Sequence, residues 1–225
     1  MSLHRRLTIS LAGGLAALLV GAACAQARVV EVGSAEGAPA PTCPSAPRLA
    51  IDRTTGYQTT VGNRTGPNVV PLPGRIVAWT IALGAPDERQ VSFFDSNFGE
   101  ASAGITVLRK GKKKLQRFNV GKSGIMKLTP YFGQVVQFPL QKTIRVHKGD
   151  IVALTVPTWA PALSQLLSDG TGWLASRPKG GCDDTDTQTA HTDLGPTRYR
   201  CKYPARLTYS ATVVTSPQPT QKTGS

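Results

Sequence analysis

The sequence predicts an all-β fold, a two-sheet antiparallel sandwich that is jelly-roll-like. Apolar residues recur with a period of two along most of the chain, which is typical of half-buried strands. The chain holds 23 glycines and 17 prolines, so turns are frequent and long helices are disfavoured. About eight to ten short strand segments separated by turns favour a sandwich.

The N-terminus predicts export. Residues 1–27 begin with the basic residues Arg5 and Arg6, continue with an apolar run from Leu7 to Ala23, and end in small residues at Ala27. These are the three parts of a secretory signal peptide. We therefore expect a secreted, extracytoplasmic protein, and no later apolar run is long enough to span a membrane.

Three regions follow the signal. Residues 28–47 are rich in Ala and Pro and are predicted to be an extended linker. Residues 48–215 carry the strand pattern and form the predicted sandwich. Residues 216–225 hold no large apolar side chain and are predicted to be a disordered tail.

The clearest strand lies at residues 75–83, where alternate residues from Val77 to Leu83 share one face. Residues 105–109 and 115–120 flank a glycine-lysine turn and predict a hairpin. Further strand segments are 135–140, 143–146, 151–156 and 206–214, with weaker ones at 49–51, 57–61, 125–128, 172–175 and 198–200. Only residues 162–167 suit a short helical turn.

The order of these motifs resembles a family of exported bacterial β-sandwich proteins. The resemblance rests on Gly-x-Ile-x-x-Trp (74–79), Ile-Thr-Val-Leu-Arg (105–109), Gln-Phe-Pro-Leu (137–140), Val-His-Lys-Gly-Asp-Ile-Val-Ala-Leu (146–154) and Ala-Arg-Leu-Thr-Tyr-Ser-Ala (205–211). It covers roughly residues 70 to 215 and implies export and a β-sandwich. It brings no reaction and no catalytic residue to this chain.

The chain is strongly basic, with a net charge of +13. Loss of Arg5 and Arg6 with the signal leaves 13 − 2 = +11 on the mature chain. Outside the cell, this charge favours contact with wall polymers, lipid headgroups, acidic polysaccharide or stray nucleic acid, and the alternative is that the lysines only keep the protein dispersed. Six cations gather on the predicted hairpin: Arg109, Lys110, Lys112, Lys113, Lys114 and Arg117. Either they bind an anionic polymer, or they protect the hairpin from edge-to-edge aggregation.

The mature chain is expected to keep three cysteines, Cys43, Cys182 and Cys201. An oxidising compartment favours one disulfide and leaves one thiol. Cys182–Cys201 is the preferred pair, and a bond from Cys43 to either of them is the alternative. Cys24 at the signal junction is either discarded or retained as the lipid-modified first residue of a lipoprotein.

Four aromatic residues in loop-like sequence are candidate ligand contacts. Trp159 and Trp173 lie among turn residues, and Tyr131 and Phe132 follow a proline. Rings exposed on loops offer flat apolar faces to sugars. The alternative is that the same rings fill the ends of the sandwich. Trp79, on an alternating strand, is expected in the core.

An acidic cluster raises the question of a metal. Asp183, Asp184 and Asp186 offer the oxygen ligands that calcium takes, and His191 lies nearby. The glycine and glutamate spacing of an EF-hand is absent, so the alternatives are a looser calcium site and a solvated loop closed by a disulfide.

Motifs for nucleotide binding and catalysis are weak. Residues 121–124 read Gly-Lys-Ser-Gly, but the second glycine and the helix of a phosphate-binding loop are missing, so a turn and no nucleotide cofactor are predicted. No Gly-x-Ser-x-Gly elbow occurs. His147 and His191 are predicted to be surface residues.

Together these observations predict an exported, non-enzymatic binding module whose ligand is a polysaccharide or an anionic wall polymer. One alternative is a structural or adhesion domain with calcium in the 183–188 loop. A second is a hydrolase with a site assembled from dispersed residues. No cofactor other than that calcium is predicted.

Overall fold

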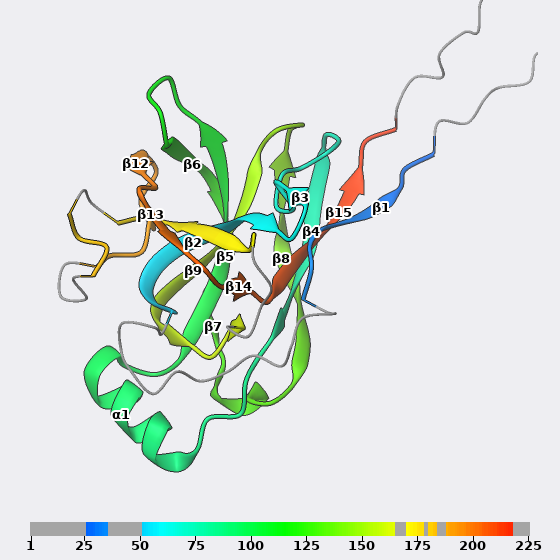
Figure 1. Cartoon of the computed structure of the whole chain (residues 1–225). Coiled ribbons are helices and arrows are strands. Elements are labelled where there is room, and N and C mark those ends of the chain that lie inside the picture. Colours follow the sequence, from blue (N-terminus) through cyan, green and yellow to red (C-terminus); the bar gives the residue numbers. More distant parts are fainter. Residues whose placement is uncertain (1–25, 36–50, 165–169, 178–179, 184–187, 218–225) are drawn as a thin grey trace, which may run out of the picture.

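The structure is a computed structural model that describes residues 26–35, 51–164, 170–177, 180–183 and 188–217. It has two main sheets of antiparallel strands that pack against each other (Figure 1). The predicted all-β, sandwich-like fold is confirmed. The predicted signal is outside the described residues except for its last two, as are most of the linker and most of the tail.

The smaller sheet has four strands in the order β1-β15-β4-β8. Their bounds are β1 Val29–Gly33, β4 Gly74–Ala82, β8 Val135–Val146 and β15 Tyr209–Thr215. Strand β1 lies within the predicted linker, so the linker prediction is wrong for these five residues. The physical reason is that Val32 is buried in the core while β1 pairs with β15 along its whole length.

The larger sheet has nine strands, in the order β12-β6-β5-β9-β2-β11-β13, with β3 paired to β2 and β7 to β5. Their bounds are β2 Ile51–Val61, β3 Arg64–Thr65, β5 Ser102–Lys110, β6 Gln116–Lys122, β7 Met126–Lys127, β9 Ile151–Ala160, β11 Gly172–Ala175, β12 Pro196–Arg198 and β13 Cys201–Tyr203. A separate pair joins β10 Leu163–Ser164 to β14 Arg206–Leu207.

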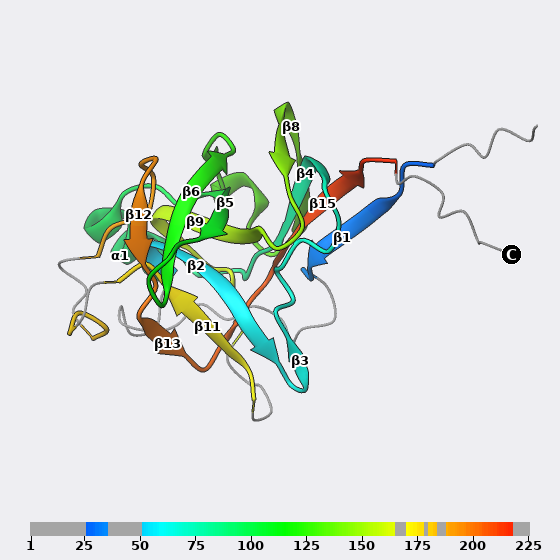
Figure 2. The same cartoon turned by 90° about the horizontal axis from the view of Figure 1, so that it is seen from above.

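One chain segment closes the larger sheet. Strand β12 pairs with β6 at one end of the strand order, and β13 pairs with β11 at the other end (Figure 2). Only Tyr199 and Arg200 separate β12 from β13. Tyr199 is fully buried, and its ring lies 5.4 Å from that of Tyr57 between centroids. It belongs to a small apolar cluster with Leu108 and Ile151.

The opposite face of the curled sheet packs on the smaller sheet and forms the main core. Ile105 and Leu154 from the larger sheet and Trp79 from β4 belong to this core. An irregularity between Ile76 and Ala78 puts Ile76 in the core together with Trp79. The predicted unbroken alternation along this strand is therefore wrong at this point.

A helix that the sequence analysis missed covers one end of the sandwich. Helix α1, Glu88–Phe98, lies at the bottom of Figure 1, and Phe94 on it stacks on Trp159 with centroids 4.7 Å apart. Asp87 caps it: the Asp87 carboxylate accepts from the Gln90 amide at 2.9 Å, and the Gln90 side chain accepts from the Asp87 amide at 3.0 Å. This capping box was the signal available in the sequence.

The other departures from the prediction are smaller. Residues 163–164 form strand β10 and not a helical turn. The short 3-10 helix at Thr129–Tyr131 begins next to Pro130. Residues 135–146 form one strand and not two. No helix in the described part of the chain has the length and apolar character needed to cross a membrane.

One hydrogen bond links the two main sheets through the core. Tyr209 on β15 is buried, and its hydroxyl donates to the Val152 carbonyl on β9 at 2.9 Å. A second, longer contact of 3.4 Å reaches the carbonyl of Gly56 on β2. The phenol therefore satisfies backbone oxygens of the larger sheet from the smaller one.

We expect Tyr209→Phe to lower the free energy of unfolding by about 1 to 2 kcal/mol, because a buried hydrogen bond is lost without a large cavity. Urea denaturation followed by circular dichroism would measure this. Tyr131→Phe is the matched control, since the Tyr131 hydroxyl makes no hydrogen bond within the described residues and its loss should leave the midpoint unchanged. Equal midpoints for the two variants would contradict the role of Tyr209.

Candidate functional site: the basic hairpin

The predicted cationic hairpin is formed by β5 and β6, which pair antiparallel from Thr106–Lys122 to Lys110–Arg117. In Figure 1 it projects at the end of the molecule opposite α1. Its turn holds Lys112, Lys113 and Lys114, all exposed. The paired part of the two strands, which we call the root of the hairpin, therefore holds the turn lysines away from the body of the sandwich.

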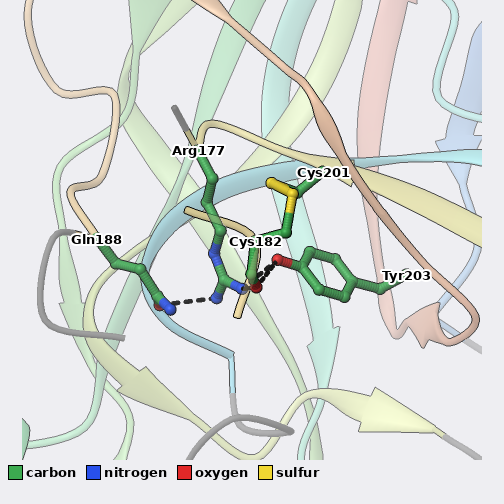
Figure 3. The surroundings of a disulfide bond; sticks show 5 residues. All are labelled: Arg177, Cys182, Gln188, Cys201 and Tyr203. Carbon is green, nitrogen blue, oxygen red and sulfur yellow. Dashed lines mark hydrogen bonds between the residues drawn. A yellow bond between two sulfur atoms is a disulfide. The ribbon is translucent and has the colours of Figure 1, made fainter. Parts of the chain in front are cut away.

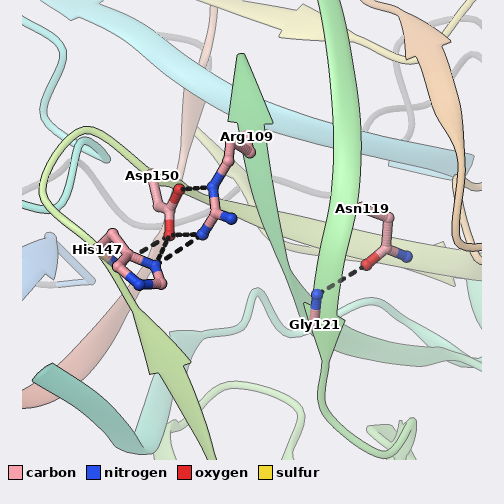
Figure 4. A network of polar contacts seen from close by, with 5 residues as sticks. All are labelled: Arg109, Asn119, Gly121, His147 and Asp150. Atoms are coloured by element: carbon pink, nitrogen blue, oxygen red, sulfur yellow. Dashed lines mark hydrogen bonds and ion pairs between the residues drawn. The ribbon is translucent and has the colours of Figure 1, made fainter. Parts of the chain in front are cut away.

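Arg109 is tied to the body of the protein. Its Nε and Nη2 atoms each lie 2.8 Å from an oxygen of Asp150, a bidentate ion pair (Figure 4). Asp150 lies almost fully buried and also accepts from the His147 backbone amide at 2.8 Å. Arg109 therefore fixes the root of the hairpin to the turn between β8 and β9.

His147 completes this contact. Its Nδ1 lies 2.8 Å from the Arg109 Nη2 atom. Because a guanidinium only donates hydrogen bonds, Nδ1 accepts, and the ring proton belongs on Nε2. His147 is exposed, as predicted, and its imidazole serves here as an acceptor for arginine.

The opposite side of the root is held by the segment that covers the larger sheet. The side-chain oxygen of Asn119 accepts from the Gly121 backbone amide at 3.2 Å (Figure 4). The backbone amide of Asn119 donates to the Gly195 carbonyl, also at 3.2 Å. The ammonium of Lys122 donates to the Thr192 carbonyl at 2.9 Å. Gly121 and Lys122 end β6, and residues 123–125 lead on to β7, which pairs with the same strand β5. The chain therefore continues along β5 without reversing, and the predicted tight turn at residues 121–124 is wrong.

The six predicted cations do not form one equivalent set. Arg109 is neutralised by Asp150, and the Arg117 guanidinium packs 5.6 Å from the Tyr57 ring centroid. Lys110 and the three turn lysines are exposed and make no ion pair or hydrogen bond through their side-chain ammonium groups within the described residues. The unneutralised charge therefore lies on these four lysines, which we call the lysine tip.

Arg198 extends this charge and was missed by the sequence analysis. It lies on β12, directly opposite Gln116 of β6, and it is exposed. Its distance from the hairpin along the chain left no local signal. Only the pairing of β12 with β6 brings it to the same edge.

The aromatic candidates do not form an exposed platform. Trp159 and Trp173 lie in β9 and β11, not in loops, and are 1% and 3% exposed. Tyr131 and Phe132 are partly buried against the same core. The prediction of loop rings available for stacking is wrong, because the turn residues around both tryptophans belong to strands that continue into the core.

His191 is buried, not on the surface as predicted. Its Nδ1 lies 3.0 Å from the Tyr199 hydroxyl and its Nε2 lies 3.0 Å from the Gly195 carbonyl oxygen. The His191 backbone amide donates to the Thr55 hydroxyl at 2.9 Å. Burial lowers the pKa of His191, although the Gly195 carbonyl and the charge of Asp193 raise it. The side chain thus helps hold residues 188–200 across the larger sheet.

The predicted disulfide is present. Cys182 and Cys201 are bonded, with their Cα atoms 5.3 Å apart (Figure 3). Buried Arg177 donates to the Cys182 carbonyl at 3.1 Å and to the Gln188 side chain at 2.7 Å, and Tyr203 donates to the Cys182 carbonyl at 2.6 Å. Cys43 and Cys24 lie outside the described residues.

The calcium prediction falls mostly outside the described residues, which include Asp183 but neither Asp184 nor Asp186. Asp183 is exposed. Within the described ranges, no three side chains of His, Cys, Asp or Glu are grouped closely enough to hold a metal ion.

Asp52 is the most perturbed acid of the described chain. It is fully buried at the start of β2, and neither of its carboxylate oxygens has a hydrogen-bond partner among the residues that the structure describes. Burial raises its pKa to about 6, although the charges of Arg177 and Arg53 lower it. Arg53 has a φ of 36°, a left-handed conformation that an L-residue adopts only with strain. The buried charge of Asp52 therefore destabilises the fold at the start of β2.

Comparison of the chain with known protein families, with curated proteins and with solved structures finds no match. The candidate site is therefore defined by geometry and charge alone.

Asp150→Asn should lower the free energy of unfolding by about 2 kcal/mol at neutral pH, because it breaks a charged, bidentate contact to a buried carboxylate. Burial raises the pKa of Asp150, but the hydrogen bonds from the Arg109 side chain and the His147 backbone amide, together with the charge of Arg109, outweigh this and lower it. The stabilisation is thus present at neutral pH and is lost as the pH falls below the usual aspartate range. Thermal melts at several pH values would measure both effects. Glu100→Gln, which breaks an exposed pair with Lys127, is the control and should leave the melting temperature unchanged.

The contribution of Asp52 to stability should change with pH in the direction opposite to that of Asp150. Because its folded pKa is raised from 3.8 to about 6, its contribution to stability falls as the pH rises from 3.8 to 6, by about 3 kcal/mol in total. His191 opposes this in part, since its lowered pKa makes stability rise with pH. The difference between wild type and Asp52→Asn, measured by urea denaturation at each pH, isolates the Asp52 contribution. A difference that does not change with pH would contradict the raised pKa.

Proposed function

We propose that the protein is an exported, non-enzymatic β-sandwich that binds an anionic polymer, such as an acidic polysaccharide or a wall polymer, through the lysine tip. The observation that carries the proposal is that the cations of the hairpin differ in whether they have an anionic partner. Arg109 is neutralised at the root, while Lys110 and the turn lysines are exposed without anionic partners. Export is supported by the signal-like N-terminus and by the Cys182–Cys201 disulfide.

The charge pattern favours a polymer of repeated anions over one small ligand. Lysine ammonium groups on flexible stems act as point charges and do not impose the bidentate geometry that arginine gives to a single anion. Several such charges on one projecting turn gain affinity by releasing counterions from a polyanion. Arg198 on the neighbouring strand extends the same positive edge. Buried tryptophans argue against sugar stacking as the main source of affinity.

Binding of fluorescently labelled polyphosphate, polygalacturonate and neutral dextran by the mature protein tests the proposal. We expect both polyanions to bind at low salt, with affinity falling steeply as salt rises, and dextran not to bind. Replacing Lys110, Lys112, Lys113 and Lys114 together by Gln should abolish binding or reduce the salt slope by about 3.

A control variant of equal charge separates the tip from the net charge. It replaces four exposed cations elsewhere by Gln, namely Arg64, Arg89, Arg145 and Lys202. We expect it to bind nearly as well as the wild type. Equal losses in the two quadruple variants would show that only the overall charge matters and would overturn the proposal.

A further inference from the structure

A second candidate site lies at the open edge of the sandwich, between β8 of the smaller sheet and the connection from β6 to β7. A hollow of about 390 Å³ opens there, which is within the range of small-molecule sites. Its floor and walls include Trp79, Phe138, Ile125, Met126 and Leu140. Its rim includes Lys122 and Lys142.

Irregular strand segments on both sides create the hollow. The pairing of β4 with β8 passes from Ile76–Ile144 directly to Ala78–Pro139, so residues 140–143 of β8 lack a backbone pairing partner on β4. β8 is an edge strand, where a proline such as Pro139 is tolerated because it need not donate to a neighbour. The strand thus bends away where the hollow opens.

The facing wall is held in place by one serine. Residues 123–125 follow the end of β6 and belong to no strand. The Ser123 amide donates to the Ile105 carbonyl at 2.9 Å, and the Ser123 hydroxyl accepts from the Ile105 amide at 2.9 Å. The hollow is therefore formed before any ligand enters.

Apolar side chains form the larger part of the lining of the hollow, and Ser123 and Gln141 contribute polar groups. Trp79 and Phe138 pack together with their ring centroids 4.9 Å apart and are almost fully buried. Ile125 and Met126 border the opening and are 47% and 37% exposed. Exposure of these two large apolar side chains to water is unfavourable in free energy. A bound apolar group would cover them and remove this penalty.

The rim carries only positive charge. No acidic residue lines the hollow. Lys122 is oriented by its bond to the Thr192 carbonyl, and Lys142 is exposed and makes no ion pair within the described residues. The carboxylate of Glu100 is paired with the Lys127 ammonium at 2.7 Å. An occupant with an apolar body and one anionic end matches this arrangement.

We propose that this hollow binds the acyl chain of an anionic amphiphile, a long-chain carboxylate of the fatty-acid type, with its headgroup beside Lys142 and Lys122. The chain lies against the Trp79–Phe138 floor and covers Ile125 and Met126. The site is independent of the lysine tip, which lies at the other end of β6.

Laurate that carries bromine on its chain tests the proposal, because bromine quenches the fluorescence of an indole that it touches. Trp79 is the only tryptophan among the residues that line the hollow. We expect saturable quenching of the disulfide-bonded mature protein. Trp79→Phe should remove most of the quenching, while calorimetry with plain laurate still detects binding. Quenching that persists in this variant would place the ligand elsewhere and overturn the proposal.

Matched variants test the two halves of the site. Lys142→Glu and the replacement of laurate by lauryl alcohol should each weaken binding about tenfold, equivalent to about 1.4 kcal/mol, whereas Lys202→Gln should not. Ile125→Asp should abolish binding, whereas Val135→Asp, at an exposed position of β8 outside the hollow, should not. Equal affinity for the acid and the alcohol, or binding that survives Ile125→Asp, would overturn the proposal. Removal of the lysine tip should leave laurate binding unchanged.

Discussion

The closure of the larger sheet by residues 196–203 is the constraint on which the rest of the structure depends. This single segment supplies β12 at one end of the strand order and β13 at the other, and Tyr199 between them is fully buried. β5 and β9 thereby become buried on both faces, one against the smaller sheet and one against Tyr199 and its neighbours. The disulfide at Cys201 ties the start of β13 to residue 182 and limits how far the segment can separate from the sheet when the protein unfolds.

This closure also shapes the surfaces that are available to ligands. Strand β6 is held by the closing segment on one side and by β5 on the other. The start of β6 therefore supports a turn of unpaired lysines, and its end borders an apolar hollow at the sandwich edge. Arg109 at the root is paired with Asp150, while the ammonium groups of the lysine tip make no ion pair or hydrogen bond within the described residues. A fixed root and an unpaired tip are what an electrostatic binding surface requires.

The sequence predicted the parts of the fold that depend on local pattern. The hairpin at 105–120 and the strand pair around the 147–150 turn are confirmed because alternation and turn residues act over a few neighbours. The strand predicted at 206–214 is confirmed only in part, because residues 206–207 form β14 in a separate pair and residues 209–215 form β15 of the smaller sheet. The helix at 88–98 was missed because its capping box was outweighed by the surrounding β pattern. For the site, the sequence identified the tip lysines. It did not show that Asp150 neutralises Arg109 or that Arg198 lies beside the hairpin, because both depend on contacts between distant segments.

The sequence by itself determined the class of fold and the concentration of lysine on one turn, because both follow from the spacing of nearby residues and from the residue types themselves. It left the pairing of Cys182 with Cys201 open against pairings with Cys43, and only the structure showed that Cys182 and Cys201 are bonded. Only the tertiary structure decided which charges remain free and which rings are exposed. Trp159 and Trp173 stand among turn residues in the sequence, yet both face the core, since burial depends on what packs opposite a strand. The apolar hollow, too, exists only where two irregular segments from different sheets meet.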